Sequence, residues 1–303
     1  MGAQLRAVRR RIAAIQSTAK ITRAQELIAA SRIIRAQQRQ RAATPYADEL
    51  QRALEAVVSR TASIDHPLVR QPARAERAAV LILTSDRGFA GGFNANVLRE
   101  AQRLRALLAE RGVAVDTYVS GRKGITWHRF RGLELAGSWS GYSETPAQAN
   151  ASAIATALLE AFARPAAEGG VDEIHIVYTQ FFSMLSQRPS ARRLLPLEIE
   201  EVEAEPPTGP VPLYEFEPSP QAVLDALLPW YVENRIYHAL LESAAAEIAA
   251  RRRAMKSATD NANDLLEQLT RDANKARQAE ITQEISEIVG GANALAETYA
   301  GSE

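Results

Sequence analysis

Two long segments, one near each end of the chain, carry apolar residues at alternating steps of three and four. The C-terminal segment, Trp230–Val289, contains no glycine or proline across 60 residues. Apolar or alanine residues recur along it and just beyond it at Ile236, Leu240, Ala244, Ile248, Met255, Ala258, Ala262, Leu265, Leu269, Ala276, Ile285, Ile288, Ala292 and Leu295. This spacing is close to the 3.5-residue period of a coiled coil. The pattern therefore predicts one very long helix, about 110 Å at a rise of about 1.5 Å per residue.

The N-terminal segment, Ala3–Thr44, supplies a partner for this helix. It also lacks glycine and proline, and its apolar positions are Leu5, Val8, Ile12, Ile15, Ala19, Leu27 and Ile34. An antiparallel pair places residues whose numbers sum to about 279 opposite each other, so that Ala3 lies near Lys275. The C-terminal residues beyond that point have no partner within the chain, yet their apolar stripe continues. A stripe of this kind predicts burial in another protein.

Between the two helices the pattern changes to alternating strands and helices. Three apolar runs read as strands, at Ala78–Thr84, Val113–Ser120 and Val171–Thr179, and two periodic segments read as helices, at Ala95–Arg111 and Ala147–Phe162. This alternation predicts a Rossmann-like open α/β domain. The fold class is therefore α/β, with a long antiparallel coiled coil of the terminal helices. The domains expected are an N-terminal shaft helix (1–60), a globular α/β foot domain (61–218) and a C-terminal shaft helix (219–303), in which Ser219 caps the helix and Pro220 begins it.

A glycine-containing loop, Ser85–Asn94, follows the first predicted strand. Glycines in such a loop let backbone amides approach a phosphate at a helix N-terminus. The spacing, however, matches neither the dinucleotide fingerprint nor the Walker loop, and no Lys-Ser or Lys-Thr pair follows. A structural strand-to-helix turn is therefore favoured over a nucleotide site.

Charge is unevenly distributed in a chain that is neutral overall, with 36 basic and 36 acidic residues. Residues 1–41 hold ten Lys or Arg and a single acid, Glu26, while Leu197–Glu217 holds seven glutamates and no base. Overall neutrality argues against a general nucleic-acid binder, and no aromatic residue interleaves with the basic ones before Tyr46. The basic helix is therefore expected to face an acidic protein surface.

Chemistry-bearing residues are scarce. The chain has no cysteine, which excludes disulfides and thiolate metal sites, and its four histidines are scattered without metal-ligand spacing. No catalytic triad or carboxylate pair can be assembled, so neither a cofactor nor a catalytic site is expected. The longest apolar run, Ala78–Leu83, is far shorter than the roughly 20 residues that cross a bilayer.

Four blocks of sequence, in order and at similar spacing, resemble the gamma subunit of F-type ATP synthases. They are Ile281–Ala292 (ITQEISEIVGGA), Arg253–Ala262 (RAMKSATDNA), Ile21–Ala24 together with Ala29–Ser31, and Ser85–Gly88 (SDRG). The similarity covers essentially the whole chain.

The resemblance implies a rotary shaft in a bacterial ATP synthase. Gamma subunits of this family thread an antiparallel coiled coil into a ring of alpha and beta subunits, and their foot binds the epsilon subunit and the membrane c-ring. Proton-driven rotation then drives ATP synthesis, or hydrolysis in reverse, at the beta subunits. By this resemblance the chain is a non-catalytic, peripheral subunit at the cytoplasmic face of the cell membrane, with no nucleic-acid partner.

The resemblance also assigns residues to contacts. The family positions that touch the beta subunits correspond to Gln25, Arg251, Arg277, Gln278 and Thr282. We expect these positions to be exposed on the helices, so that substitution changes stability by only about 0.5 kcal/mol or less. The c-ring positions correspond to Tyr214 and Glu217.

The chain departs from the family pattern at three places. Gln25 stands where methionine is common, and Phe89-Ala90 replaces the more usual Leu-Cys. The cysteine-bearing insertion of the photosynthetic form is absent, so no thiol switch is expected.

Two other classes of function have sequence support. A nucleotide-binding α/β enzyme with a coiled-coil stalk requires the isolated chain to bind nucleotide. A homo-oligomeric scaffold with an α/β nucleotide-binding domain requires the long helices to pair with copies of themselves.

Overall fold

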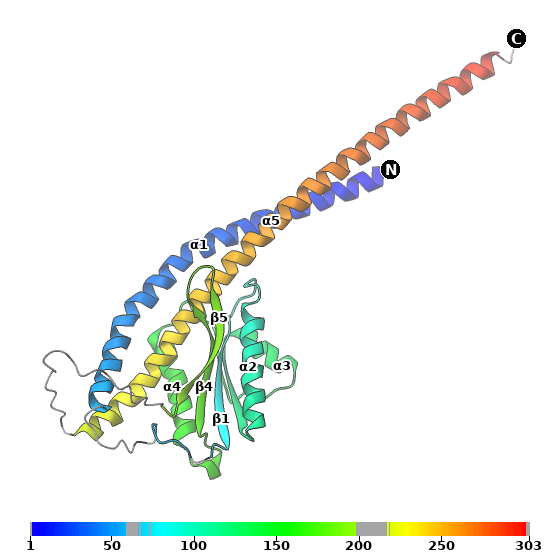
Figure 1. Ribbon diagram of the computed structural model, residues 1–303. Helices are drawn as coiled ribbons and strands as arrows, with labels where there is room; N and C mark the ends of the chain where they lie inside the picture. Colours follow the sequence, from blue (N-terminus) through cyan, green and yellow to red (C-terminus); the bar gives the residue numbers. More distant parts are fainter. Residues whose placement is uncertain are drawn as a thin grey trace. The chain divides into compact units, whose positions relative to one another are not determined.

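The structure is a computed structural model that describes residues 2–58, 66, 68–72, 74–197, 217 and 219–300. Its elements along the chain are α1 (Gly2–Val58), β1 (Arg77–Leu83), α2 (Phe93–Glu110), β2 (Ala114–Ser120), α3 (Arg122–Phe130), β3 (Gly137–Trp139), α4 (Gln148–Ala163), a short 3-10 helix (Ala166–Glu168), β4 (Glu173–Phe181), β5 (Gln187–Leu195) and α5 (Pro220–Ala300), as Figure 1 shows. Its internal contacts divide the chain into two compact units. The terminal unit joins Met1–Ile28 to Arg253–Glu303, and the central unit is Ala29–Arg252.

The central unit contains a five-stranded sheet in the order β3-β2-β1-β4-β5. The strands β1 to β4 are parallel, and β5 runs antiparallel to β4. At the centre, Leu81 of β1 lies opposite both Tyr118 of β2 and Ile176 of β4. The six residues Ala78–Leu83 are all buried, as expected for a parallel strand that is covered on both faces.

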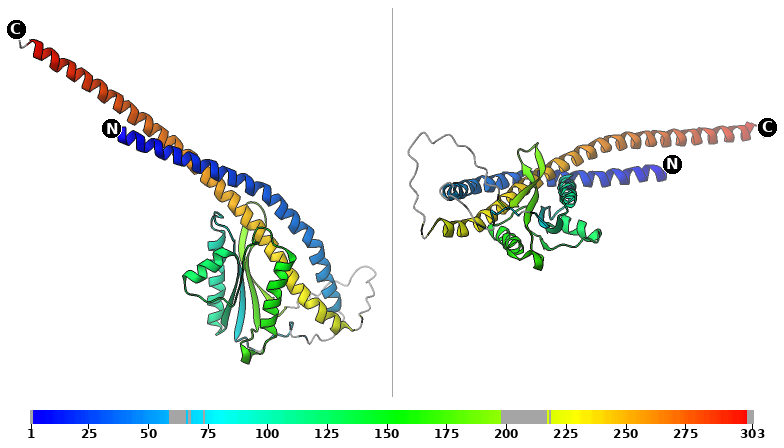
Figure 2. Two further views of the ribbon diagram at one scale, coloured as in Figure 1. Left: turned by 180° about the vertical axis from the view of Figure 1, so that it is seen from behind. Right: turned by 60° about the horizontal axis from the view of Figure 1, so that its bottom comes forward.

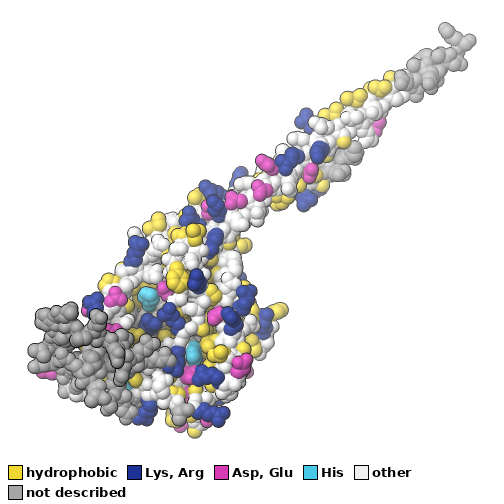
Figure 3. Space-filling model, viewed as in Figure 1, with side chains coloured by type: hydrophobic (Ala, Val, Ile, Leu, Met, Phe, Trp, Pro, Cys, Tyr) yellow, Lys and Arg dark blue, Asp and Glu magenta, His cyan; other side chains and the backbone are white. Residues whose placement is uncertain are grey.

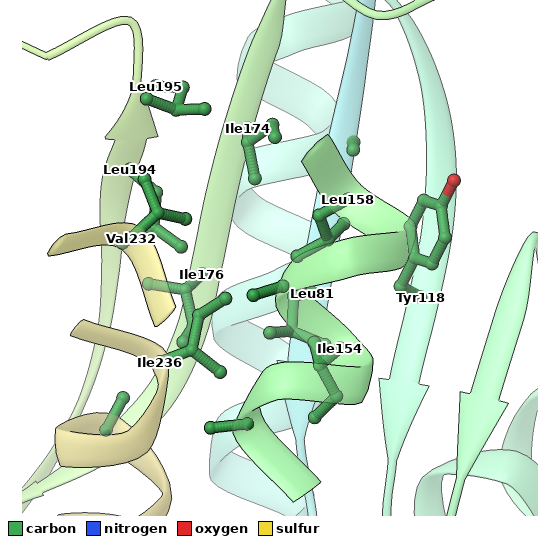
Figure 4. Close-up of a cluster of buried hydrophobic side chains, with 14 of the residues drawn as sticks. Leu81, Tyr118, Ile154, Leu158, Ile174, Ile176, Leu194, Leu195, Val232 and Ile236 are labelled. Atoms are coloured by element: carbon green, nitrogen blue, oxygen red, sulfur yellow. The ribbon is translucent and has the colours of Figure 1, made fainter. Parts of the chain in front are cut away.

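Helices cover both faces of this sheet. One face packs against α4 and the first part of α5, and the other against α2 and α3 (Figures 1 and 2). Figure 4 shows the first of these cores, in which Leu81 and Ile176 of the strands meet Ile154 of α4 and Ile236 of α5. Val80 and Ile82 alternate with Leu81 and belong to the opposite core, because successive side chains of a strand point to opposite faces. The predicted open α/β domain is confirmed.

Four elements were not expected from the sequence: α3, β3, the short 3-10 helix and β5. β5 has the sequence QRPSARRLL, in which three arginines and a proline are more typical of a loop. It forms nonetheless because it is an edge strand, where a proline need not donate to a neighbour and charges are tolerated. The hairpin that leads into β5 is closed by the backbone amides of Phe182 and Ser183, which both donate to the carbonyl oxygen of Ser186.

In the central unit α1 packs against α5 through small side chains. Ala29, Ile33 and Ala36 of α1 meet Ala245, Ile248 and Ala249 of α5, and all six are buried. Alanines on both sides let the helix backbones approach closely. The start of α5 is capped as predicted, since the amide of Ala222 donates to the side-chain oxygen of Ser219 at 3.2 Å.

In the terminal unit the two helices are also paired. The hydroxyl groups of Thr22 and Thr259 lie 2.8 Å apart. The predicted register would have placed Ser257 opposite Thr22, so the antiparallel pairing is confirmed to within two residues. Leu5 of α1 and Leu269 of α5 are buried along this part of the pair.

The apolar stripe continues on α5 beyond its last buried residues. The exposed fractions are 43% for Ile281, 56% for Ile285, 70% for Ile288 and 52% for Val289. Hydrophobic side chains accordingly remain at the surface along the outer part of α5 (Figure 3). The predicted unpartnered stripe is therefore present among the described residues. The predicted domain boundaries at residues 60 and 218 stay a prediction. The two compact units have other boundaries, which divide α1 after Ile28 and α5 after Arg252.

Candidate functional site

The first feature of the site is the loop after β1, which carries the SDRG motif. The side chain of Asp86 accepts hydrogen bonds from three backbone amides, those of Arg122 at 3.0 Å, Gly141 at 2.8 Å and Ser143 at 3.0 Å. Its neighbour Ser85 is fixed by Asn94, whose side-chain oxygen accepts from the Ser85 amide at 2.9 Å. Asp86 thus ties the loop after β1 to the segments that follow β2 and β3, at the edge of the sheet where the parallel strands end. This geometry supports the interpretation of the loop as a structural strand-to-helix turn over its interpretation as a nucleotide site.

The second feature is a charge network around Arg251, on α5 within the central unit. Its guanidinium donates to Glu144 at 2.9 Å and to Glu247, one helical turn earlier, at 2.6 Å. It also donates to the carbonyl oxygens of Arg87 at 3.4 Å and Gly88 at 3.3 Å in the loop after β1. Arg32 of α1 forms an ion pair with the same Glu144. The network therefore joins α1, α5 and two loops of the α/β domain.

The expectation that Arg251 lies on an exposed helix face is wrong. Its exposed fraction is 7%, and that of Glu247 is 1%. Its guanidinium is already engaged by two carboxylates and two carbonyl oxygens of the chain, which identifies it as part of the central unit's interior. The sequence could not distinguish this arrangement, because an i,i+4 pair of Glu and Arg is equally typical of a solvated helix surface. Glu144 comes from a distant loop and carries no signal of its own.

Burial dominates the electrostatics of Glu247. It raises the pKa of this carboxyl to about 7, even though Arg251 lowers it. The raised pKa means that the folded chain binds this proton more tightly than the unfolded chain, whose value is near 4.5. Ionising Glu247 therefore opposes folding, and its cost grows as the pH rises from about 4.5 to about 7.

We expect a Glu247→Gln variant to remove this pH dependence. Relative to the variant, the wild-type chain should lose up to about 3 kcal/mol of unfolding free energy between pH 4.5 and pH 7, since one pKa unit corresponds to about 1.4 kcal/mol. Urea unfolding of both proteins at several pH values measures the difference. The control is Glu280→Gln, which makes the same chemical change at a position that is only partly buried. A constant difference between wild type and Glu247→Gln over this pH range would contradict the assignment.

A basic pocket of about 510 Å³ adjoins the network in the central unit. Arginines dominate its lining, and they are Arg32, Arg35 and Arg39 from α1, Arg87 from the loop after β1, and Arg122 from α3. The acids that line it are Asp86 and Glu144, both already engaged as described. Among the described residues, Arg35 and Arg39 have no ion pair, so the pocket keeps excess positive charge and suits an anionic group.

The remaining residues assigned by resemblance lie elsewhere. Gln25, Arg277, Gln278 and Thr282 are exposed and belong to the terminal unit, where the last three share a short stretch of α5. The hydroxyl of Thr282 donates to the carbonyl oxygen of Gln278 at 2.9 Å. Glu217 is exposed, and Tyr214 lies outside the described residues. Sequence reasoning missed Arg32, Glu144 and Glu247, which complete the Arg251 network.

A metal site and a membrane span are both absent from the part of the chain that the structure describes. No group of three or more His, Asp or Glu side chains there is arranged to hold a metal ion. No helix there combines the length and apolar character needed to cross a lipid bilayer.

Comparison with known proteins gives a consistent family. The family model described as ATP synthase matches residues 4–295. The ATP synthase gamma chain of Acidothermus cellulolyticus is 61% identical over 303 residues, and that of Thermobifida fusca is 59% identical over 306; each match covers all of both chains.

Solved structures agree at the level of the fold. The rotor of the Euglena gracilis mitochondrial ATP synthase matches with a TM-score of 0.66 at 14% identity, covering 93% of this chain and all of that one. A second Euglena structure, of the OSCP, F1 and c-ring assembly, matches with a TM-score of 0.68 at 16% identity, covering all of this chain and 97% of that one. From the family model over residues 4–295 and the sequence identity of about 60% over its whole length, the chain belongs to the ATP synthase gamma chain family.

Proposed function

We propose that this chain is the central rotor subunit of a bacterial proton-translocating ATP synthase, and that it couples rotation of a c-ring to ATP synthesis or hydrolysis at the beta subunits. It contributes no catalytic group and no cofactor. Its work is mechanical, because it transmits rotation between partners. The observation that carries this proposal is the exposed stripe Ile281, Ile285 and Ile288 on a helix whose preceding turns are paired. In a family of ATP synthase subunits, this stripe fits inside the ring of alpha and beta subunits, which would hold the end of α5 while it turns. We call this contact the bearing.

We assign direct contacts with the beta subunits to four residues and an indirect role to a fifth, Arg251. Gln25, Arg277, Gln278 and Thr282 offer amide, guanidinium and hydroxyl donors from exposed helix surfaces. Arg251 acts on the ring indirectly, by holding the loop at Arg87 and Gly88. The basic pocket beside that loop supports the expectation of an acidic partner surface.

The c-ring and the epsilon subunit bind the α/β domain, and this attachment keeps the chain at the cytoplasmic face of the membrane. Tyr214 and Glu217 supply the c-ring contact, through an aromatic side chain and a nearby carboxylate.

We expect the double substitution of Tyr214 and Glu217 by alanine to uncouple the enzyme. Hydrolysis by the detached soluble complex should persist, while ATP-driven proton pumping in membrane vesicles should fall severalfold. Glu203→Ala, in the same acidic stretch, is the matched control and should leave pumping unchanged. Intact pumping in the double variant would show that this segment is not the c-ring contact.

Purification of a tagged chain from its native cells tests the proposed function as a whole. We expect alpha, beta and the tagged chain in a ratio of three to three to one, together with epsilon and the c-ring subunit. Recovery of the chain only with copies of itself would instead favour the homo-oligomeric scaffold. Micromolar binding of ATP to the isolated chain would favour the nucleotide-binding enzyme.

A further inference from the structure

A second cavity lies in the central unit between α2 and α3, on the sheet face opposite α4. Its volume is about 250 Å³, and its lining consists of Ile82, Leu98, Ala101, Gln102, Arg105, Trp127, His128, Arg131 and Leu133. Ile82, Leu98 and Ala101 are each less than 10% exposed and belong to the hydrophobic core beneath. The cavity therefore has an apolar floor that is built into the fold.

The polar groups of this cavity are positive or neutral. Arg105 and Arg131 line it, and no acidic side chain does. Neither arginine takes part in an ion pair among the described residues. The guanidinium carbon of Arg131 lies 4.0 Å from the centroid of the Trp127 ring, and this stacking fixes the position of the cation. Two cations without counterions beside an apolar floor suit a ligand that carries a negative charge.

A buried histidine, His128, also lines the cavity. Its Nδ1 lies 2.8 Å from the carbonyl oxygen of Gly124, which can only accept, so Nδ1 carries a proton. Burial lowers the pKa of His128, and the charges of Arg105 and Arg131 lower it further. The same two arginines thus impose a positive potential on a buried group that lines the cavity.

We propose that the cavity between α2 and α3 binds a small organic anion, with an apolar body over Ile82, Leu98 and Ala101 and a carboxylate at Arg105 and Arg131. The volume of the cavity limits the size of the ligand. If each non-hydrogen atom takes up roughly 30 Å³, as a water molecule does in the liquid, the cavity holds about eight such atoms. A nucleotide is far too large. A short-chain or single-ring carboxylic acid fits.

Fluorescence of Trp127 provides a direct assay of the full-length chain. In a Trp139→Phe/Trp230→Phe background, which leaves Trp127 as the single tryptophan, hexanoate should produce a saturable change. Hexanamide has the same number of non-hydrogen atoms but no charge, and it should bind about tenfold more weakly, as expected for loss of a charge-assisted hydrogen bond. Arg105→Gln/Arg131→Gln should abolish this preference. Arg103→Gln, which removes an exposed charge on α2 that does not line the cavity, should preserve it.

Several outcomes would overturn the proposal. They are the absence of saturable binding, equal affinity for hexanoate and hexanamide, or the same loss of preference in Arg103→Gln as in the double variant. Ala101→Leu fills the cavity, so a folded Ala101→Leu protein that still binds hexanoate would place the site elsewhere. Binding to the free chain but not to the assembled complex would show that another subunit fills the cavity. None of these results bears on the rotor function.

Discussion

Replacing Arg251 by alanine should lower the free energy of unfolding of this chain at pH 9 by about 3–5 kcal/mol, the usual cost of leaving one member of a buried ion pair unpaired, and by less at pH 5, where Glu247 is protonated. The substitution leaves Glu247 buried without its cation and removes one of the two arginines that contact Glu144. It also removes the hydrogen bonds to the carbonyl oxygens of Arg87 and Gly88, so the loop after β1 keeps its packing on α5 through Ala90 but loses these two polar contacts. Urea unfolding monitored by circular dichroism measures the loss.

Two further variants identify its cause. Arg252→Ala removes the same side chain from the adjacent, exposed position and should change stability by about 0.5 kcal/mol or less. Glu247→Gln in the Arg251→Ala background should recover part of the loss at pH 9, where the folded chain must otherwise bury the Glu247 charge or bind a proton against the bulk pH, and little of it at pH 5. If Arg251→Ala proved as stable as Arg252→Ala, the network would contribute nothing to folding, and a direct partner contact by Arg251 would be favoured.

Removing residues 279–303 should leave the rest of the chain folded and sharply weaken its assembly with alpha and beta subunits. Among the residues of α5 whose burial the structure describes, Leu269 is the last buried one; the removed segment begins beyond it, and its residues Ile281, Ile285 and Ile288 are at least 43% exposed. Burying each such side chain in a partner contributes about 1.5–3 kcal/mol. We therefore expect at least about a hundredfold loss of assembly affinity, measured by titration of alpha and beta subunits against the tagged chain.

A paired substitution sharpens this experiment. Ile285→Ser/Ile288→Ser should reproduce most of the assembly loss, whereas Ser286→Ala, on the same exposed segment, should not. The truncated chain, Ile285→Ser/Ile288→Ser and Ser286→Ala should all keep the thermal unfolding midpoint of the isolated wild-type chain. A truncated chain that melts earlier would show that the segment folds back on the chain, and unimpaired assembly would remove the bearing from the proposed function.

Periodicity predicted the parts of this fold in which a continuous apolar pattern decides the structure. The run Ala78–Leu83 reads as a buried strand whichever neighbours it has, and the long helices follow from heptad-like spacing. β5 escaped prediction because its pairing with β4 depends on long-range backbone hydrogen bonds instead of its own apolar pattern. The Arg251 network escaped for a related reason. Its members come from α1, α5 and a loop, and only the tertiary fold reveals that an arginine in a helical pattern is buried.

The hydrogen bonds of Asp86 have a consequence for how the α/β domain responds to its surroundings. The amides of Arg122, Gly141 and Ser143 converge on one point at the edge of the sheet where the strands end, as amides that bind an anion do, and here they hold a carboxylate that is part of the chain. A tethered anion is present at a fixed effective concentration. A free phosphate would have to displace this built-in carboxylate to reach the same three amides, so their hydrogen bonds do not depend on a bound ligand.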